Sequence, residues 1–299
     1  MKKRKRYFTL DIIINPIAGG KHGKKIKKAL LAVIERLHER KIKYTIHQTE
    51  KKGHAKELTA KLIKDGSETI VALGGDGTLH EVINGFTDFD KTALGLIPCG
   101  TGNDFANALN LPLDPVKALD LIIDGTPKYT DFMQMPTVRG INIIGMGIDV
   151  DVLKRYESLK KKTKLGYTMS LVKTLFDFDY TDFTVELDEE KTIDYRSFIA
   201  CIANGHVYGG GIPICPVASP IDNDLNFLAV KEIKRSKIVG AFLKLKKGKI
   251  LTLPQSEHTP CKKVKITTKS PYTVNVDGEL YENIPFEVEI VSNKLRMYR

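Results

Sequence analysis

The spacing of apolar positions changes repeatedly along the first 125 residues, and each change marks an expected element. Residues 7–14 are β-branched and apolar, which is typical of a buried strand. Apolar residues then recur at helical spacing from Ile26 to Leu37, which predicts an amphipathic helix. Further strands are expected at 43–49, 69–73 and 93–97, and further helices at 54–65 and from about residue 79. Such alternation predicts a parallel sheet covered by helices.

The pattern changes after about residue 130, where short strand-like runs dominate. These runs lie at 140–146, 182–187, 198–203, 226–230, 264–268 and 286–291. Helical patterns persist at 150–177 and 236–246. We therefore expect two domains, an α/β domain over 1–130 and a β-rich domain over 131–289.

Composition agrees with a globular protein of this size. The chain has 299 residues, of which 42% are hydrophobic and 28% charged, which excludes disorder and collagen. The longest apolar stretches fall well short of a membrane span. The four cysteines are far apart without a C-x-x-C pair, so we expect free thiols rather than structural zinc. The basic start, MKKRKR, is followed by a strand pattern rather than by the apolar core of a signal peptide.

The formal net charge of +11 favours partners that carry negative charge. Lysines cluster at 24–28, 160–162 and 244–247, so the excess is spread over both halves. Nucleic acid, an anionic membrane surface and phosphorylated small molecules each fit this charge. A lysine-rich solvated surface explains any single cluster equally well.

Three glycine-rich loops, at 15–20, 74–78 and 98–104, follow the first, third and fourth expected strands of the first domain. The carboxyl ends of parallel strands are where such sheets bind ligands, and bare backbone N–H groups at helix starts suit an anion. Other motifs are missing from the sequence: there is no Walker A loop, G-x-G-x-x-G after the first strand, G-x-S-x-G or H-E-x-x-H. The three loops together therefore predict phosphate binding.

One of these loops carries a specific resemblance. Gly74-Gly75-Asp76-Gly77-Thr78 resembles the G-G-D-G-T signature of the diacylglycerol kinase catalytic domain superfamily, which includes sphingosine and ceramide kinases and, more distantly, NAD kinases. Residues 97–106 resemble the P-x-G-T-x-N-D-F-A segment of the lipid kinases. Later segments of the family follow in order at 145–149, 166–167, 204–211, 216–218 and 277–279. The resemblance covers nearly the whole chain and is closest to the soluble bacterial diacylglycerol kinase-like lipid kinases.

The resemblance implies a fold and a set of site residues. The fold is the NAD kinase/diacylglycerol kinase-like pair of an α/β domain and a β-sandwich-like domain, with a C-terminal strand at 290–299 returning to the first domain. The implied nucleotide-binding residues are Asn15, Pro16, Ile17, Ala18, Gly19, Thr49, Gly75, Asp76, Gly77, Thr78, Leu79, His80, Glu81 and Thr101. The implied magnesium network is formed by Ser219, Asp222 and the carbonyl group of Asp224. The implied general base is Glu279, with Asp277 beside it.

Two of the implied sites can be examined further from the chemistry of their side chains. A carboxylate at Asp76 would repel phosphate, so we expect it to bind Mg²⁺ and to act in catalysis. The family usually has D-D-G-x-L where this chain has Ile221-Asp222-Asn223-Asp224-Leu225. Asn tolerates the left-handed turn almost as well as Gly does, so the loop is expected to survive, but the loss of one carboxylate at Ile221 alters the donor set.

The resulting expectation is an ATP- and Mg²⁺-dependent lipid kinase. Diacylglycerol is the favoured substrate, with phosphatidic acid as product, and a sphingoid base or another lipid alcohol is the alternative. An NAD kinase-like phosphotransferase and a non-catalytic nucleotide- or lipid-binding regulator are the rival hypotheses. We expect a cytoplasmic protein that binds peripherally to the anionic inner face of the membrane and does not bind nucleic acid. The resemblance also allows a homodimer.

Overall fold

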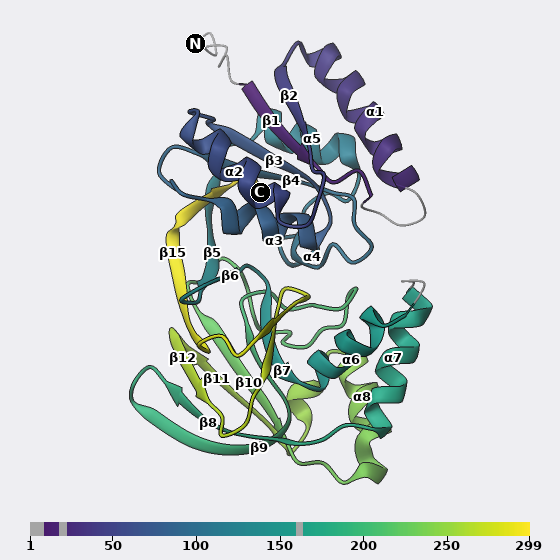
Figure 1. Ribbon diagram of the computed structural model, residues 1–299, viewed down its shortest axis with the longest axis vertical. Helices are drawn as coiled ribbons and strands as arrows, with labels where there is room; N and C mark the ends of the chain where they lie inside the picture. Colours follow the sequence, from purple (N-terminus) through teal and green to yellow (C-terminus); the bar gives the residue numbers. More distant parts are fainter. Residues whose placement is uncertain (1–8, 18–22, 160–163) are drawn as a thin grey trace. The chain divides into compact units, whose positions relative to one another are not determined.

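The computed structural model describes residues 9–17, 23–159 and 164–299, and it divides into two compact units. The first unit contains residues up to Thr130 together with Asn293–Arg299, and the second contains Asp131–Ser292. Strands β5 (Lys128–Gln134) and β15 (Glu287–Met297) carry the chain from one unit to the other (Figure 1). In the described residues, no helix is both long enough and apolar enough to span a bilayer.

The first unit is a parallel sheet with helices between its strands, as the sequence predicts. Its elements are β1 Thr9–Ile14, α1 Lys24–Arg40, β2 Lys43–Gln48, α2 His54–Lys64, β3 Thr69–Gly74, α3 Asp76–Gly85, β4 Ala93–Pro98, α4 Asp104–Ala108 and α5 Pro115–Asp124. The strand order is β2-β1-β3-β4, and all neighbours are parallel. The end of β15 adds a further parallel strand, because Arg296 and Met297 pair with Ala93 and Leu94 of β4.

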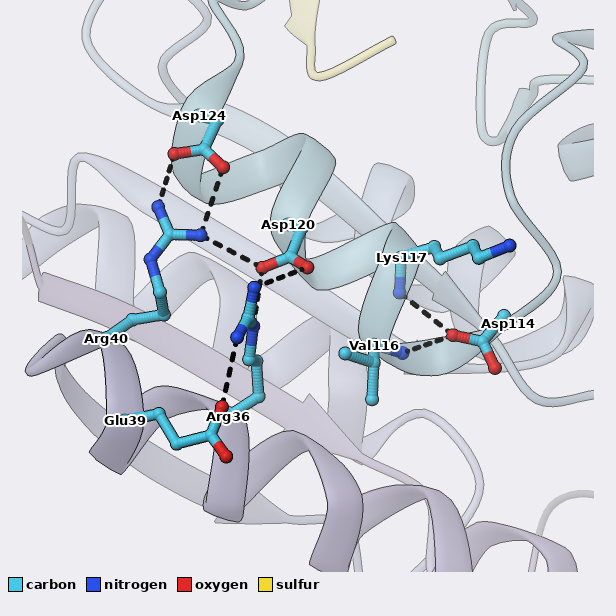
Figure 2. Close-up of polar contacts among 8 residues, drawn as sticks. All are labelled: Arg36, Glu39, Arg40, Asp114, Val116, Lys117, Asp120 and Asp124. Atoms are coloured by element: carbon cyan, nitrogen blue, oxygen red, sulfur yellow. Dashed lines mark hydrogen bonds and ion pairs between the residues drawn. The ribbon is translucent and has the colours of Figure 1, made fainter.

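Helices α1 and α5 share one apolar core with the sheet and are joined at their surface by ion pairs. Arg36 binds both carboxylate oxygens of Asp120, at 2.8 and 3.0 Å, and Arg40 bridges Asp120 and Asp124 (Figure 2). Asp114 caps α5 by accepting hydrogen bonds from the N–H groups of Val116 and Lys117 (Figure 2). Burial of the apolar residues of both helices stabilises the packing, and the ion pairs orient the two helices relative to each other.

The second unit is antiparallel and β-rich, which confirms the expected fold class. Besides β5, its elements are β6 Arg139–Gly140, β7 Ile143–Gly147, α6 Ile148–Glu157, α7 Lys164–Phe176, β8 Thr181–Leu187, β9 Lys191–Ala203, β10 Leu225–Lys231, α8 Ile238–Lys246, β11 Ser256–Cys261, β12 Lys263–Thr267, β13 Thr273–Val276, β14 Glu279–Glu282 and the start of β15, with short 3-10 turns at Arg235–Lys237 and Ile250–Thr252. The strand ladder runs β14-β13-β7-β9-β8-β12-β15, and β10 pairs with β9 and β11. One core lies within the strands, and a second core lies between the strands and α6, α7 and α8.

Two elements differ from the sequence-based prediction: one helix begins earlier, and one strand is interrupted. Helix α3 begins at Asp76 rather than near residue 79, because Gly75 is extended and an acidic residue in the first turn favours a helix start. The expected strand at 140–146 is broken between β6 and β7. At this break the backbone N–H groups of Ile141 and Asn142 bond to a side chain, Asp277, instead of to a neighbouring strand.

Candidate active site

The glycine-rich loops after β3 and β4 pack backbone against backbone. A Cβ atom placed on Gly75 would lie 2.9 Å from the Cα atom of Gly100, and one on Gly100 would lie 2.6 Å from the Cα atom of Gly75. A Cβ atom on Gly74 would lie 2.4 Å from Oγ1 of Thr78. Each distance is shorter than a side chain tolerates. The close approach of the two loops therefore requires glycine at positions 75 and 100, and the contact with Thr78 requires glycine at position 74.

The start of α3 forms the anion-attracting end of this loop pair. Gly75 is the N-cap residue of α3, and glycine has no side chain that could accept hydrogen bonds from the first turn. The N–H groups of that turn therefore receive no side-chain cap from this position. Gly77 lies in this turn and is exposed, whereas Thr78 is buried. The helix dipole and the first-turn N–H groups together suit a phosphate group.

The loop after β4 is held by Asn103 and by a lysine from α1. Asn103 has a left-handed backbone (φ 54°), and its Oδ1 atom accepts a hydrogen bond of 2.7 Å from the N–H group of Gly100. Lys25 donates from Nζ to the carbonyl oxygen of Gly100 at 2.8 Å. The N–H group of Gly100 is therefore used within the loop, and the cation of Lys25 lies beside this loop, where it can attract phosphate.

Two carboxylates meet beside Gly102. A Cβ atom on this glycine would lie 3.1 Å from Oδ2 of Asp104 and 3.2 Å from Oδ2 of Asp76. Asp76 also accepts a hydrogen bond of 3.3 Å from the N–H group of Phe105, in the first turn of α4. The two acids lie in the first turns of α3 and α4, respectively. Oxygen donors in this arrangement suit a divalent cation that accompanies a nucleotide.

The loop after β1 is described in part. Asn15 accepts a hydrogen bond from the N–H group of Ile17, and the chain returns at Gly23, where a Cβ atom would lie only 2.2 Å from the carbonyl oxygen of Pro16. Ile17 is exposed. The predicted nucleotide-binding residues Ala18 and Gly19 lie outside the described residues.

The remaining predicted nucleotide-binding residues have different surroundings. Thr49 is buried at the end of β2, where its N–H group bonds to the carbonyl oxygen of Ile14, and Thr101 is exposed beside Gly100. The side chains of Leu79 and His80 are buried. Glu81 accepts hydrogen bonds from the N–H groups at the start of α2, those of Gly53 and Ala55. These three side chains thus support the loops, since burial or capping occupies them.

In the second unit, the carboxylate of Asp277 binds three consecutive backbone N–H groups. Ile141 donates to Oδ2 at 2.8 Å, while Asn142 and Ile143 donate to Oδ1 at 2.8 and 3.1 Å. Asp277 and Gly278 both have positive φ, 54° and 96°, and form the two-residue turn between β13 and β14. Asp277 therefore connects this hairpin to the break between β6 and β7. This geometry argues for a positioning role rather than the catalytic role that the resemblance implies for it.

Glu279 lies two residues further on, at the first position of β14. It pairs with Val276 across the hairpin, and its side chain is half-buried. Because the turn is held by Asp277 and by a hydrogen bond of 2.8 Å from Gly278 N–H to Asn275 Oδ1, the backbone of Glu279 is fixed. The structure thus places one carboxylate in the hairpin as a clamp and the other at the strand start.

The predicted magnesium loop contains several oxygen groups and one cation. Asn223 has the left-handed backbone expected of it (φ 64°), and Asp222 accepts a hydrogen bond from the N–H group of Asp224. Asp131, which is buried, accepts a hydrogen bond of 2.8 Å from the N–H group of Asn223. Burial, followed by repulsion from the neighbouring acids, raises the pKa of Asp222. Ser219 precedes this loop and is half-buried.

Lys262 supplies the cation of this loop. Its ammonium group forms an ion pair of 2.7 Å with Asp224 and also binds the carbonyl oxygen of Asn223. Across the described residues, no group of three or more acidic, His or Cys side chains is arranged to hold a metal. Lys262 pairs with the carboxylate of Asp224, whereas the resemblance implies the carbonyl group of Asp224 together with Ser219 and Asp222, so the magnesium network at this loop stays a prediction.

Four residues with evident roles were not predicted from the sequence. They are Lys25, Asn103, Asp104 and Asp131. Asn103 and Asp104 stand within the N-D-F-A segment itself, so the segment was a usable signal for both. Lys25 could not be distinguished from its neighbours in a lysine cluster, and Asp131 could not be connected with residue 223 before the fold was known.

Comparisons with known proteins agree with this geometry. Residues 9–135 match the model of the diacylglycerol kinase catalytic domain, and residues 142–299 match that of the YegS C-terminal NAD kinase beta sandwich-like domain. A protein of Staphylococcus aureus strain Mu3 named "Putative lipid kinase" is 29% identical over 249 residues, which cover 82% of this chain and 81% of the relative.

Solved structures show the same fold. A crystal structure of a diacylglycerol kinase from Bacillus anthracis strain Sterne has a TM-score of 0.73 at 21% identity, covering 99% of this chain and 98% of that one. A second structure from that strain, "A putative diacylglycerol kinase", has a TM-score of 0.80 at 24% identity with the same coverage. With its glycine-rich loops inside the first matched domain and its Asp277–Glu279 hairpin inside the second, the chain belongs to the diacylglycerol kinase catalytic domain family, in the form that carries the YegS C-terminal domain.

Proposed function

We propose that this protein transfers the γ-phosphoryl group of ATP to the hydroxyl group of diacylglycerol and so forms phosphatidic acid. The observation that carries the proposal is the catalytic domain match over residues 9–135, which contains all three glycine-rich loops and the start of α3. Kinases with this catalytic domain use ATP. The choice of diacylglycerol rests on the family, and the assay at the end of this section tests it.

ATP phosphates would bind at the start of α3. The N–H groups of the first helical turn, around Gly77, attract negative charge, and the paired glycines Gly75 and Gly100 let the phosphates approach the backbone. Lys25 adds a full positive charge beside the same loop. These groups neutralise and orient the phosphates, which is most of what phosphoryl transfer requires of a protein.

Magnesium enters this proposal as the ion that accompanies ATP. Asp76 and Asp104 would hold it, since both carboxylates lie beside Gly102 at the edge of the phosphate-binding loops. The bound ion would neutralise charge on the phosphates. The loop at Ser219, Asp222 and Asp224 would hold the separate magnesium network that the resemblance implies, and it is assigned no part in this step.

Glu279 is the residue that we assign as general base. Both oxygens of Asp277 already accept backbone hydrogen bonds, so taking up a proton there would disrupt the hairpin. Glu279 lies beside it on a fixed backbone. In the step, the hydroxyl oxygen of the lipid bonds to the γ-phosphorus, the bond from that phosphorus to the β–γ bridging oxygen breaks, ADP leaves, and the hydroxyl proton passes to the carboxylate of Glu279.

The lipid substrate implies peripheral binding to an anionic membrane, and we propose that the protein acts at the cytoplasmic face. The support is the net charge of +11 and the lysine clusters of both halves. Each basic residue near such a surface contributes about 1 kcal/mol, and salt screens the attraction. A homodimer and the absence of nucleic-acid binding are further parts of the proposal that size measurements and binding assays can check.

The test is a radiolabelled-ATP assay in mixed micelles containing diacylglycerol, a sphingoid base or no lipid, with NAD assayed in parallel. We expect phosphatidic acid from diacylglycerol, and Glu279→Gln should lower the rate by about 10²–10⁴-fold without changing ATP affinity. Glu282→Gln is the matched control, because Glu282 is exposed on the same strand. Phosphorylation of NAD instead of lipid would overturn the proposal. A Glu279→Gln rate within about threefold of the parent would remove the assignment of the base.

A further inference from the structure

The segment around α8 concentrates positive charge. Residues 231–249 contain eight lysines or arginines and a single acidic residue, Glu232. The helix itself, Ile238–Lys246, lies near the end of this segment and packs on the second unit. A run with this composition is either a solvated surface or the binding site of an anionic partner.

Helix α8 has apolar residues on two opposite faces. Ile238 and Ala241 are buried in the core, as expected for a helix that packs on a sheet. Val239 and Leu243 are 50% and 53% exposed, although they are aliphatic. Positions 243 and 246 follow 239 at intervals of four and three residues, and 247, the C-cap, lies four residues after 243, so these positions share the outer face. This face, consisting of Val239, Leu243, Lys246 and Lys247, is called the α8 surface below.

The lysines around α8 lack the acidic partners that other lysines of this unit have. Lys231, Lys262, Lys263 and Lys265 each form an ion pair with a carboxylate. Lys234, Lys237, Lys246, Lys247 and Lys249, by contrast, form no ion pair with any residue that the structure describes. Lys246 instead lies over the ring of Phe242, at 5.7 Å. Their charge is therefore available to an external anion.

The inner side of α8 has too little space for a lipid chain. A cavity lined by Leu171, Ile238, Phe242 and other apolar residues has a volume of about 30 Å³, which is room for one or two water-sized groups. Lipid contact through α8 would thus involve its outer residues rather than a tunnel behind it.

We propose that the α8 surface docks on an anionic lipid bilayer. The lysines would contact phosphate headgroups, and Val239 and Leu243 would enter the boundary between headgroups and acyl chains, as in other interfacial helices. Exposed aliphatic side chains favour a bilayer over nucleic acid, because a phosphodiester backbone offers them no apolar contact. The proposal deepens the proposed function by giving the enzyme a surface for its membrane, but it is tested by binding alone, without ATP.

The experiment is flotation of the full chain with vesicles of phosphatidylcholine containing phosphatidylglycerol, compared with vesicles of phosphatidylcholine alone. Lys246→Ala/Lys247→Ala should weaken binding to the anionic vesicles by about 25-fold, or about fivefold for each lysine. The control Lys263→Ala/Lys265→Ala removes the same number of charges from β12, where both lysines form ion pairs. Because exposed ion pairs contribute little free energy, this variant should change vesicle binding by less than about threefold.

The apolar contribution has its own pair of variants. Leu243→Ser should weaken binding to the anionic vesicles about fivefold, because a half-exposed leucine loses its contact with the acyl region. Leu31→Ser is the control, since Leu31 is 68% exposed on α1. Circular dichroism of each variant checks that the helices are intact.

The outcomes separate this proposal from the proposed function. Equal losses from the α8 and β12 lysine pairs would overturn the docking surface, because binding would then follow net charge alone. An unchanged affinity of Leu243→Ser, together with binding of single-stranded RNA that depends on Lys246 and Lys247, would assign the surface to nucleic acid. Selective loss of vesicle binding in a protein that phosphorylates no lipid would support the surface and contradict the kinase.

Discussion

Replacement of Asp277 tests whether this carboxylate is a structural clamp or a catalytic group. Its two oxygens accept three N–H hydrogen bonds, from Ile141, Asn142 and Ile143. All three donor residues are buried, so their N–H groups would lose partners that water replaces poorly. If Asp277 is a clamp, its loss should reduce the stability of the fold first and reduce turnover only as a consequence.

The magnitude follows from the contacts. Hydrogen bonds to a charged acceptor contribute about 1.5–3 kcal/mol each, and the half-exposed position of Asp277 argues for less, about 1 kcal/mol for each of the three. The left-handed backbone at this position adds about 1 kcal/mol for an Ala side chain. We therefore expect Asp277→Ala to lower the free energy of unfolding by about 4 kcal/mol.

Two further substitutions separate these contributions. Asp277→Gly accepts the left-handed turn, so it should cost about 3 kcal/mol from hydrogen bonding alone. Asp277→Asn keeps one carbonyl acceptor for Asn142 and Ile143 but turns an N–H donor toward Ile141, and should cost about 2 kcal/mol. The predicted order of destabilisation is therefore Ala, then Gly, then Asn.

Urea denaturation followed by circular dichroism gives the global effect, and hydrogen exchange measured by mass spectrometry gives the local one. Amide protons of residues 141–143 should exchange faster in Asp277→Ala, whereas Glu279→Gln should leave both measurements unchanged. A variant of Asp277 with parental stability and parental exchange at 141–143, but with turnover abolished, would refute the clamp and return Asp277 to the catalytic residues.

Three further predictions concern the ATP site and the buried acid on α6. Gly77→Val should raise the Kd for ATP at least tenfold while circular dichroism stays unchanged, because Gly77 is exposed in the helical turn where we propose that phosphate binds. An unchanged Kd would remove the loop from the site. Lys25→Met should raise the Km for ATP by about 10–100-fold, and Lys25→Arg should recover part of this loss. If the Km of Lys25→Met equals that of the parent, the role of Lys25 is limited to its hydrogen bond with Gly100. Burial raises the pKa of Asp149 to about 6, so the folded state keeps a proton that the unfolded chain has lost, and stability should fall as pH rises from about 4 to 6. Asp149→Asn should remove a loss of about 3 kcal/mol over this range in urea titrations, and an identical slope in both proteins would contradict the shift.

The sequence predicted the two-part fold well because its signals are local. Apolar spacing determines where α1 and β1 lie, and the uninterrupted apolar runs at β3 and β4 indicate strands buried on both faces. The start of α3 was misplaced for a physical reason. Glycine and aspartate in G-D-G-T resemble a turn, yet Asp76 and Gly77 form the first turn of the helix, where an acidic residue is favourable.

Residues that depend on long-range contacts were harder to predict. Lys25 and Gly100 are 75 positions apart, and Asp277 contacts residues more than 130 positions earlier. No periodicity in the sequence reports such a contact, since it arises only when separate strands pair. The ion pair between Lys262 and Asp224 is of the same kind, since the two residues are far apart in the sequence.

The Asp277-Gly278-Glu279 hairpin shows why three adjacent residues can need three different properties. Asp277 must be short and negatively charged to bind the N–H groups of residues 141–143, and it must tolerate a left-handed backbone. Gly278 must adopt a second positive φ to close a two-residue turn. With both ends of the turn fixed, the backbone direction at Glu279 is set by the pairing of β13 with β14 and with β7. If Glu279 is the base, as we propose, a backbone held in this way reduces the conformational entropy lost when substrate binds, and the clamp at Asp277 would contribute to turnover without accepting a proton.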